Sequence, residues 1–142
     1  MNINTKFAVS VHLLALLSFR RKTQIFSDLL AQSVNTNPVV IRRLISRLRK
    51  ADLVETKVGG GYELTRPAGE INLLDVYRAV TSKEGGLLHM HANPNPACFV
   101  GRNIHDALEM PMVKANLAMQ QSLKSTSIAD IAAFIRDREN AA

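Results

Sequence analysis

Two groups of residues in this sequence have side chains suited to acting on a partner: the arginines of residues 38–51 and the single cysteine, Cys98. A guanidinium group can bind a phosphate or the edge of a guanine through several donors at once. A thiol becomes reactive when a nearby cation or helix N-terminus favours its thiolate form. Arg102 follows Cys98 by four residues, just before a predicted helix. We therefore expect the pKa of Cys98 to be lowered.

Two interpretations of Cys98 stay open. In the first it is a regulatory residue, a redox switch that is oxidised to a sulfenic acid or capped by a small thiol. In the second it is a small buried hydrophobic residue, as most free cysteines are. His89 and His91 could join Cys98 around a metal ion, but their spacing matches no standard closed site, so we predict no metal site.

An enzyme that uses Cys98 as its nucleophile is a competing hypothesis. His91 or His105 would then serve as the base. The sequence shows neither an acid that would orient that base nor an oxyanion-binding element. We therefore predict that the chain is not an enzyme.

Positive charge is concentrated in the first half of the chain. The 142 residues carry 18 Lys and Arg against 12 Asp and Glu, a formal net charge of +6. Residues 1–66 hold eleven basic and four acidic residues, a net charge of +7, whereas residues 67–142 hold seven and eight, a net charge of −1. A composition with 46% hydrophobic residues is typical of a folded chain. The basic half predicts a polyanionic partner.

The arginines lie on a predicted amphipathic helix over residues 38–51. Asn37 is suited to cap this helix and Pro38 to its first position. Apolar residues recur at i, i+3, i+4 and i+7: Ile41, Leu44, Ile45 and Leu48. The opposite face is predicted to carry Val39, Arg42, Arg43, Ser46 and Lys50, with Arg47 at its edge.

Neighbouring segments complete a winged helix-turn-helix. A short helix capped by Ser27 and a three-residue polar turn precede the arginine helix, which is typical of a helix-turn-helix. Residues 53–65 alternate as two short strands around three glycines, which predicts a β-hairpin wing. We expect Arg42 and Arg43 to read bases and Val39 to touch a thymine methyl group. The other predicted DNA contacts are Thr36, Asn37, Ser46, Arg47, Lys50, Lys57, Gly60 and Tyr62.

Further helices flank this unit. The apolar run in the predicted helix 4–18 is too short to span a bilayer and lacks a cleavage site, which favours a cytoplasmic protein without a membrane partner. A helix capped by Asn72 should pack on the winged unit. A long helix from about Gly101 to Leu123 should kink or break at Pro111, and Ser127 should cap a last helix. The long helix has little of its own chain to pack against, which predicts a homodimer.

The predicted fold class is therefore mainly α with a small β-hairpin wing, a winged helix-turn-helix domain followed by a long dimerisation helix. The predicted segments are a DNA-binding domain at 1–81, a sensor or linker loop at 82–100, and a dimerisation and C-terminal helix segment at 101–142.

At the level of whole motifs, the sequence resembles the Rrf-type bacterial winged helix-turn-helix transcription regulators, the family that includes IscR, NsrR and CymR. The resemblance lies in NTNPVVIRRLISRLRKADLVETKVGGGYELTRPAGEINLLDVYRAV at 35–80, together with FAVSVHLLALL near the N-terminus and STSIADI near the C-terminus. It implies a homodimeric regulator, usually a repressor, that binds a near-palindromic double-stranded DNA operator. It also implies a recognition helix at 38–51 and a wing at 58–62.

Three features depart from the family pattern. Asp52 stands where the family often has glycine, and the wing is short, without an arginine beside its glycines. Members that sense through an iron–sulfur cluster carry three cysteines before the long helix, whereas this sequence has only Cys98. We therefore predict no cofactor. The alternatives to a redox-sensing repressor are a regulator that responds to a small ligand or metal, and an RNA-binding winged-helix protein.

Overall fold

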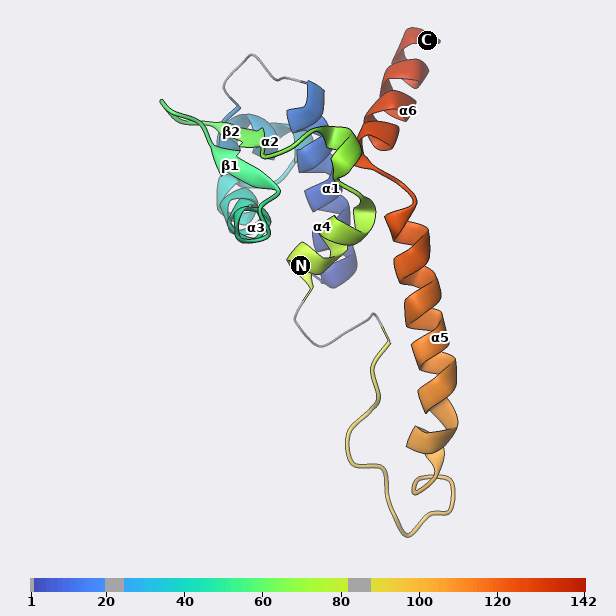
Figure 1. Cartoon of the computed structure of the whole chain (residues 1–142). Coiled ribbons are helices and arrows are strands. Elements are labelled where there is room, and N and C mark those ends of the chain that lie inside the picture. Colours follow the sequence, from blue (N-terminus) through green and yellow to red (C-terminus); the bar gives the residue numbers. More distant parts are fainter. Residues whose placement is uncertain (1, 20–24, 82–87) are drawn as a thin grey trace.

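A computed structural model describes residues 2–19, 25–81 and 88–142 (Figure 1). Its elements are, in chain order, α1 (Ile3–Phe19), α2 (Ser27–Val34), α3 (Pro38–Lys50), β1 (Val54–Thr56), β2 (Tyr62–Leu64), the 3₁₀ helix η1 (Ala68–Glu70), α4 (Leu73–Val80), α5 (Ile104–Lys124) and α6 (Ile128–Asn140). Strands β1 and β2 pair in an antiparallel register, with Val54 opposite Leu64 and Thr56 opposite Tyr62. The predicted fold class, mainly helical with a hairpin wing, is confirmed.

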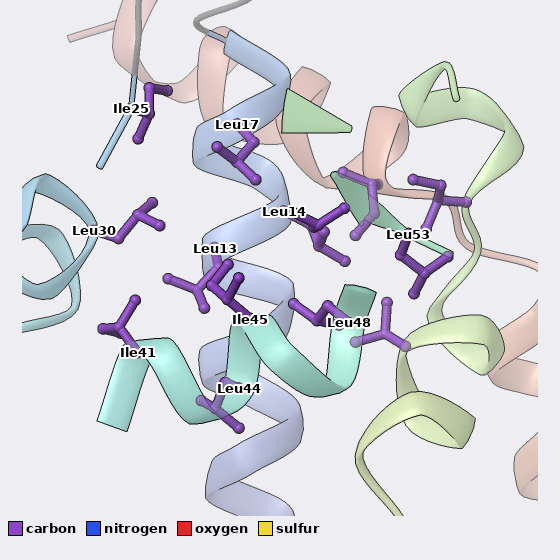
Figure 2. Close-up of a cluster of buried hydrophobic side chains, with 14 of the residues drawn as sticks. Leu13, Leu14, Leu17, Ile25, Leu30, Ile41, Leu44, Ile45, Leu48 and Leu53 are labelled. Atoms are coloured by element: carbon purple, nitrogen blue, oxygen red, sulfur yellow. The ribbon is translucent and has the colours of Figure 1, made fainter. Parts of the chain in front are cut away.

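One hydrophobic core holds the helix-turn-helix in place (Figure 2). Helix α3 contributes the four residues of its predicted apolar stripe, all buried: Ile41, Leu44, Ile45 and Leu48. Opposite them, α1 contributes Leu13, Leu14 and Leu17. Each such side chain removed from water contributes about 1.5–3 kcal/mol. Burial of the stripe therefore fixes which face of α3 remains outside.

Helix α6 belongs to the same packed unit. Ile128 is completely buried in the core, and α6 packs along α1. The Ile128 amide donates to the carbonyl of Ile71 at 2.8 Å, and the Leu73 amide donates to the carbonyl of Thr126 at 2.9 Å. We call α1–α4, the wing and α6 the head. The sequence had grouped this last helix with residues 101–142, whereas its contacts are with the head.

The rest of the described chain, residues 88–124, forms the arm, which comprises an irregular loop and α5 (Figure 1). Its loop runs along the helix, since the Leu88 amide donates to Asn116 Oδ1 at 3.4 Å. Helix α5 begins at Ile104 rather than Gly101. It continues through Pro111, so the helix does not break there, which was one of the two predicted alternatives. Because Ala107 is exposed, water can bond to the carbonyl that proline leaves unpaired. Across the described ranges, no helix has the length and apolarity needed to cross a bilayer.

Side-chain caps define the starts of three α-helices in the described chain. Asn37, Asn72 and Ser127 cap α3, α4 and α6 as predicted, and the last two form capping boxes with an aspartate three residues on. The cap predicted at Ser27 is wrong. Ser27 is already helical, and Phe26 is the N-cap without a side-chain bond. The chain before α2 is held against the wing, so it enters the helix one residue early.

Left-handed backbone occurs where the chain reverses. Gly59, Gly60 and Gly61 have φ values of 88°, 99° and 84°, which favour glycine in the wing turn. Asp52, directly after α3, has φ of 59°. Aspartate tolerates this conformation better than most residues, so Asp52 can adopt the left-handed backbone that glycine adopts readily. Its backbone carbonyl also accepts a hydrogen bond from Arg66 Nη1 at 3.2 Å.

Candidate nucleic-acid interface

The face of α3 that points away from the core is exposed, as its sequence pattern predicted. The exposed residues on it are Val39, Arg42, Arg43, Ser46, Arg47 and Lys50. Val39 keeps 49% of its surface exposed at the start of the helix. The structure thus brings together an apolar contact, a hydroxyl and several cations on one helical surface, which is the combination that reads base edges and phosphates in a major groove.

The two predicted contacts before α3 already have structural roles. Asn37 Oδ1 accepts hydrogen bonds from the amides of Val39 at 3.0 Å and Val40 at 3.1 Å. Its carbonyl oxygen is therefore engaged by the cap, and its NH₂ group is the part suited to an outside partner. Thr36 is half-buried, and its amide donates to the carbonyl of Ala31 at 2.9 Å.

Arg47 has an additional intramolecular role. Its Nη1 donates to the carbonyl of Val80 at 3.1 Å, at the end of α4. This bond ties α3 to the end of α4. A guanidinium has five N–H donors, so the side chain can hold this bond and still contact a phosphate.

The wing lies against the segment that precedes α2. The Tyr62 amide donates to the carbonyl of Ile25 at 2.8 Å. Lys57, half-buried, lies 3.5 Å from Glu63 across the hairpin, and the Gly60 amide donates to the Lys57 carbonyl at 3.0 Å. The predicted wing contacts are therefore part of a well-bonded hairpin, and Val58 at its tip is fully exposed.

Phe26 is a residue of this surface that sequence reasoning missed. A Cβ atom placed on Gly60 would lie 2.8 Å from Phe26 Cε1, so the turn packs directly on the ring. The ring nevertheless remains 47% exposed. The available signal was the glycine run itself, because a middle glycine makes room for a neighbouring side chain as well as for a turn. Phe26 fixes the position of the wing relative to α2.

Cys98 lies far along the chain from this surface, in the loop of the arm, and its thiol is exposed. Backbone hydrogen bonds from Gly101, and secondarily from Val100, lower the pKa of the Cys98 thiol. The predicted direction of the shift agrees with the structure, but the expected cause differs. Helix α5 begins only at Ile104, and the Arg102 guanidinium donates to the carbonyl of Pro96 at 3.4 Å. The interpretation of Cys98 as a buried hydrophobic residue is wrong.

The histidines are not grouped around Cys98 in the described part of the chain. The rings of His91 and His105 meet edge to face at 5.3 Å, and His105 Nε2 lies 2.9 Å from the carbonyl oxygen of His91. His12 lies in the head, 2.8 Å from Ser33 Oγ. Within the described part of the chain, no three His, Cys, Asp or Glu side chains are grouped so that they could hold a metal ion.

Comparison with known proteins gives this geometry a family. Residues 3–133 match the Rrf2 family, described as iron-dependent transcriptional regulators. The chain belongs to the Rrf2 family. It is 45% identical over 130 residues to YwnA of Bacillus subtilis (strain 168), whose name places it among HTH-type transcriptional regulators; the match covers 91% of this chain and 96% of YwnA.

Solved structures agree with this assignment. A crystal structure described as a DNA-binding protein is 40% identical, with a TM-score of 0.72 over 89% of this chain and 97% of the other. CymR, the global cysteine regulator of B. subtilis, is 23% identical with a TM-score of 0.70 over 94% of this chain and 97% of CymR, which shows a shared fold. The protein is thus a DNA-binding transcriptional regulator of the Rrf2 family and not an enzyme.

Iron dependence, the property in the Rrf2 description, does not fit the residues present here. A cluster site built from three thiolates needs three cysteines, and this sequence contains one. The exposed Cys98 also lacks two further ligands of a suitable type grouped around it in the part of the chain that the structure describes. The described residues of this Rrf2 protein therefore do not fit an iron–sulfur cluster.

Proposed function

We propose that this Rrf2 protein is a homodimeric, sequence-specific repressor that acts in the cytoplasm and responds to oxidants through Cys98. The observation that carries the DNA-binding part is the exposed face of α3 beside the wing. Its apolar and cationic residues lie on a helix whose opposite face is fixed by burial. A rigid helix of this kind can present side chains to a major groove at a defined angle.

Within this proposal, the residues divide between reading bases and holding the backbone. Arg42 and Arg43 read base edges, one of them with two hydrogen bonds to a guanine, and Val39 contacts a thymine methyl group. The remaining residues position the protein on phosphates and sugars: Thr36, Asn37, Ser46, Arg47, Lys50, Lys57, Gly60 and Tyr62.

The dimer part of the proposal is supported by α5. Met110, Val113 and Leu117 lie at i, i+3 and i+7 on this helix and are 59%, 45% and 53% exposed. We call these residues the α5 stripe. The half-buried apolar residues of α5, such as Leu108 and Met112, lie on the opposite side of the helix from the stripe. Pairing with a second copy would cover the stripe, and two α3 helices about 34 Å apart would read successive major grooves.

Electrophoretic mobility shifts test the DNA-binding part. The probes are the promoter fragment upstream of the protein's own gene, a random duplex of equal length and an RNA duplex. We expect the promoter fragment to bind about 10³-fold more tightly than random DNA. Equal affinity for all DNA would contradict sequence-specific binding, and preference for the RNA would favour the RNA-binding alternative. Transcripts from the bound promoter should rise when the gene is deleted, and a fall would contradict repression.

The redox part rests on the exposed, acidified thiol of Cys98. A Cys98 thiolate attacks one oxygen of hydrogen peroxide, the O–O bond breaks, and the products are a sulfenic acid and hydroxide. We expect peroxide to weaken promoter binding by the wild-type protein and to leave the Cys98→Ser variant unchanged. Identical responses of the two proteins would remove this switch.

A further inference from the structure

A groove of about 440 Å³ crosses the head between α1, α2 and α6. Its lining is mostly apolar and includes Ala8, His12, Phe19, Ser33, Ile131 and Ile135. Small-molecule sites typically span about 300–1,000 Å³ and combine apolar walls with a few polar groups. This groove has that size and that composition, and neither the DNA surface nor the arm uses it.

One polar pair interrupts the apolar walls. His12 Nε2 lies 2.8 Å from Ser33 Oγ, so the two groups share one hydrogen bond. If the hydroxyl donates it, the neutral imidazole carries its proton on Nδ1. If the imidazole donates it, the Ser33 hydroxyl keeps its own O–H as a donor for another partner. In either case, the pair retains a donor that can bond to an oxygen of a ligand.

A cation stands at the edge of the same groove. The Arg136 guanidinium carbon lies 5.8 Å from the centre of the Phe19 ring, and Phe19 is a wall residue that is 43% exposed. The lining residues include no Asp or Glu. The groove therefore combines an apolar floor, an exposed aromatic ring and positive charge, which is complementary to an anion with an apolar body.

We propose that this groove binds a small organic anion, one carboxylate on an aromatic body of one or two rings. The rings lie on the aliphatic walls and against Phe19, where a flat body gains the most contact. The carboxylate pairs with Arg136 at the groove edge. An all-aliphatic partner helix would leave this charge unused.

The position of the groove connects it to DNA binding, a step that rests on the proposed function. Ser33 lies on α2, the first helix of the helix-turn-helix, and α2 packs against α3. A ligand held between Ser33 and α6 biases where α2 sits relative to α1. Any such bias is reciprocal, so DNA and ligand change each other's affinity by the same factor.

Isothermal titration calorimetry with 2-naphthoate, without DNA, tests the site itself. We expect saturable binding of one 2-naphthoate per chain and at least about fivefold weaker binding of the neutral naphthalene-2-carboxamide. Arg136→Gln should weaken 2-naphthoate binding about fivefold and leave the carboxamide unchanged. Arg138→Gln is the matched control, since Arg138 lies two residues on and stacks over Phe134, which does not line the groove, whereas Arg136 stacks over the wall residue Phe19. It should bind as the wild type does.

Several results would overturn the proposal. These are the absence of saturable 2-naphthoate binding, equal affinity for the carboxamide, or equal losses in the Arg136 and Arg138 variants. If a second copy of the chain covers the groove instead, Ile135→Glu will lower the mass measured by light scattering and 2-naphthoate will not bind. Ala8→Trp, which fills the groove from an exposed position, should abolish binding while circular dichroism stays unchanged; full binding by this variant would place the ligand elsewhere.

The regulatory link has its own readout. Saturating 2-naphthoate should change the promoter affinity of the wild type at least about threefold and that of Ala8→Trp not at all. An unchanged wild-type affinity would overturn the link while leaving the calorimetric site standing. Failure of promoter binding in the absence of 2-naphthoate would instead contradict the proposed function and not the groove.

Discussion

The head and the arm are made from one chain but are stabilised in different ways. Every fully buried apolar side chain among the described residues belongs to the head, including Ile128 and Ala132 of α6. The described arm, residues 88–124, buries none, although α5, with 21 residues, is the longest helix among the described residues. A head of this kind is specified by its own core. The arm keeps apolar surface exposed, so its structure is completed by whatever covers that surface.

Breaking the α5 stripe should have the largest effect. We expect the double variant Val113→Asp, Leu117→Asp to be monomeric at micromolar concentration, because aspartates would have to be buried between two helices. Loss of the linked second half-site should weaken promoter binding by about 100-fold or more. Light scattering and mobility shifts measure the two effects.

The matched control for this prediction lies on the same helix. Ala115 is exposed and points about 160° away from Leu117 at 3.6 residues per turn. Ala115→Asp should keep both the dimer and the promoter affinity. The head of the double variant should still unfold at the same urea midpoint as the head of the wild type. A double variant that remains dimeric would mean that the exposed stripe has another use.

Changes on the head should affect DNA reading without affecting assembly. Arg43→Ala or Arg42→Ala should weaken promoter binding by about 5–150-fold, the equivalent of about 1–3 kcal/mol, and leave random DNA nearly unaffected. Lys50→Ala is the comparison on the same helix and should weaken both DNAs alike, with a salt slope lower by about one. Equal losses on both DNAs for the two arginine variants would show that they contact phosphates only.

How much the sequence predicts also differs between the two regions. In the head, Asn37, Pro38 and the apolar stripe of α3 are local signals, and together they locate α3 to within one residue. The cap of α2 was wrong because it depends on a non-local contact, the pairing of Ile25 with Tyr62 in the wing. The place of α6 on α1 is non-local in the same sense, and no pattern in residues 127–140 encodes it.

In the arm, the sequence does not determine which face of the long helix is buried. Helix α5 carries apolar residues on two opposite faces, so its periodicity does not identify a single buried side. Leu108 and Met112 are half-buried, whereas Val113 and Leu117 are exposed. The sequence therefore predicts a helix but cannot assign its faces. The groove of the head was missed as well, because it is lined by residues from three helices that are distant in sequence.

A smaller effect tests the local signals of the head. Asn37→Ala removes the acceptor of two amide hydrogen bonds at the start of α3, which should lower the free energy of unfolding by about 1 kcal/mol. Ser27→Ala should change it by much less, because the Ser27 side chain makes no cap bond. Urea denaturation of the two variants measures the contrast. Equal losses would show that the start of α2 depends on its serine after all.

The smallest predicted effect concerns the reactivity of the arm. Backbone hydrogen bonds lower the pKa of the Cys98 thiol, so a larger fraction is thiolate at neutral pH than in an unstructured peptide. The rate of alkylation by iodoacetamide should therefore rise with pH to a midpoint below that of a peptide cysteine, and exceed the peptide rate at pH 7. The control is the same protein in 8 M urea, where the turn that holds Val100 and Gly101 is lost. Because the thiol is exposed in the folded arm, unfolding should slow the reaction rather than speed it. Faster alkylation in urea would mean that the arm shields Cys98, which would contradict its role as a sensor in the free protein.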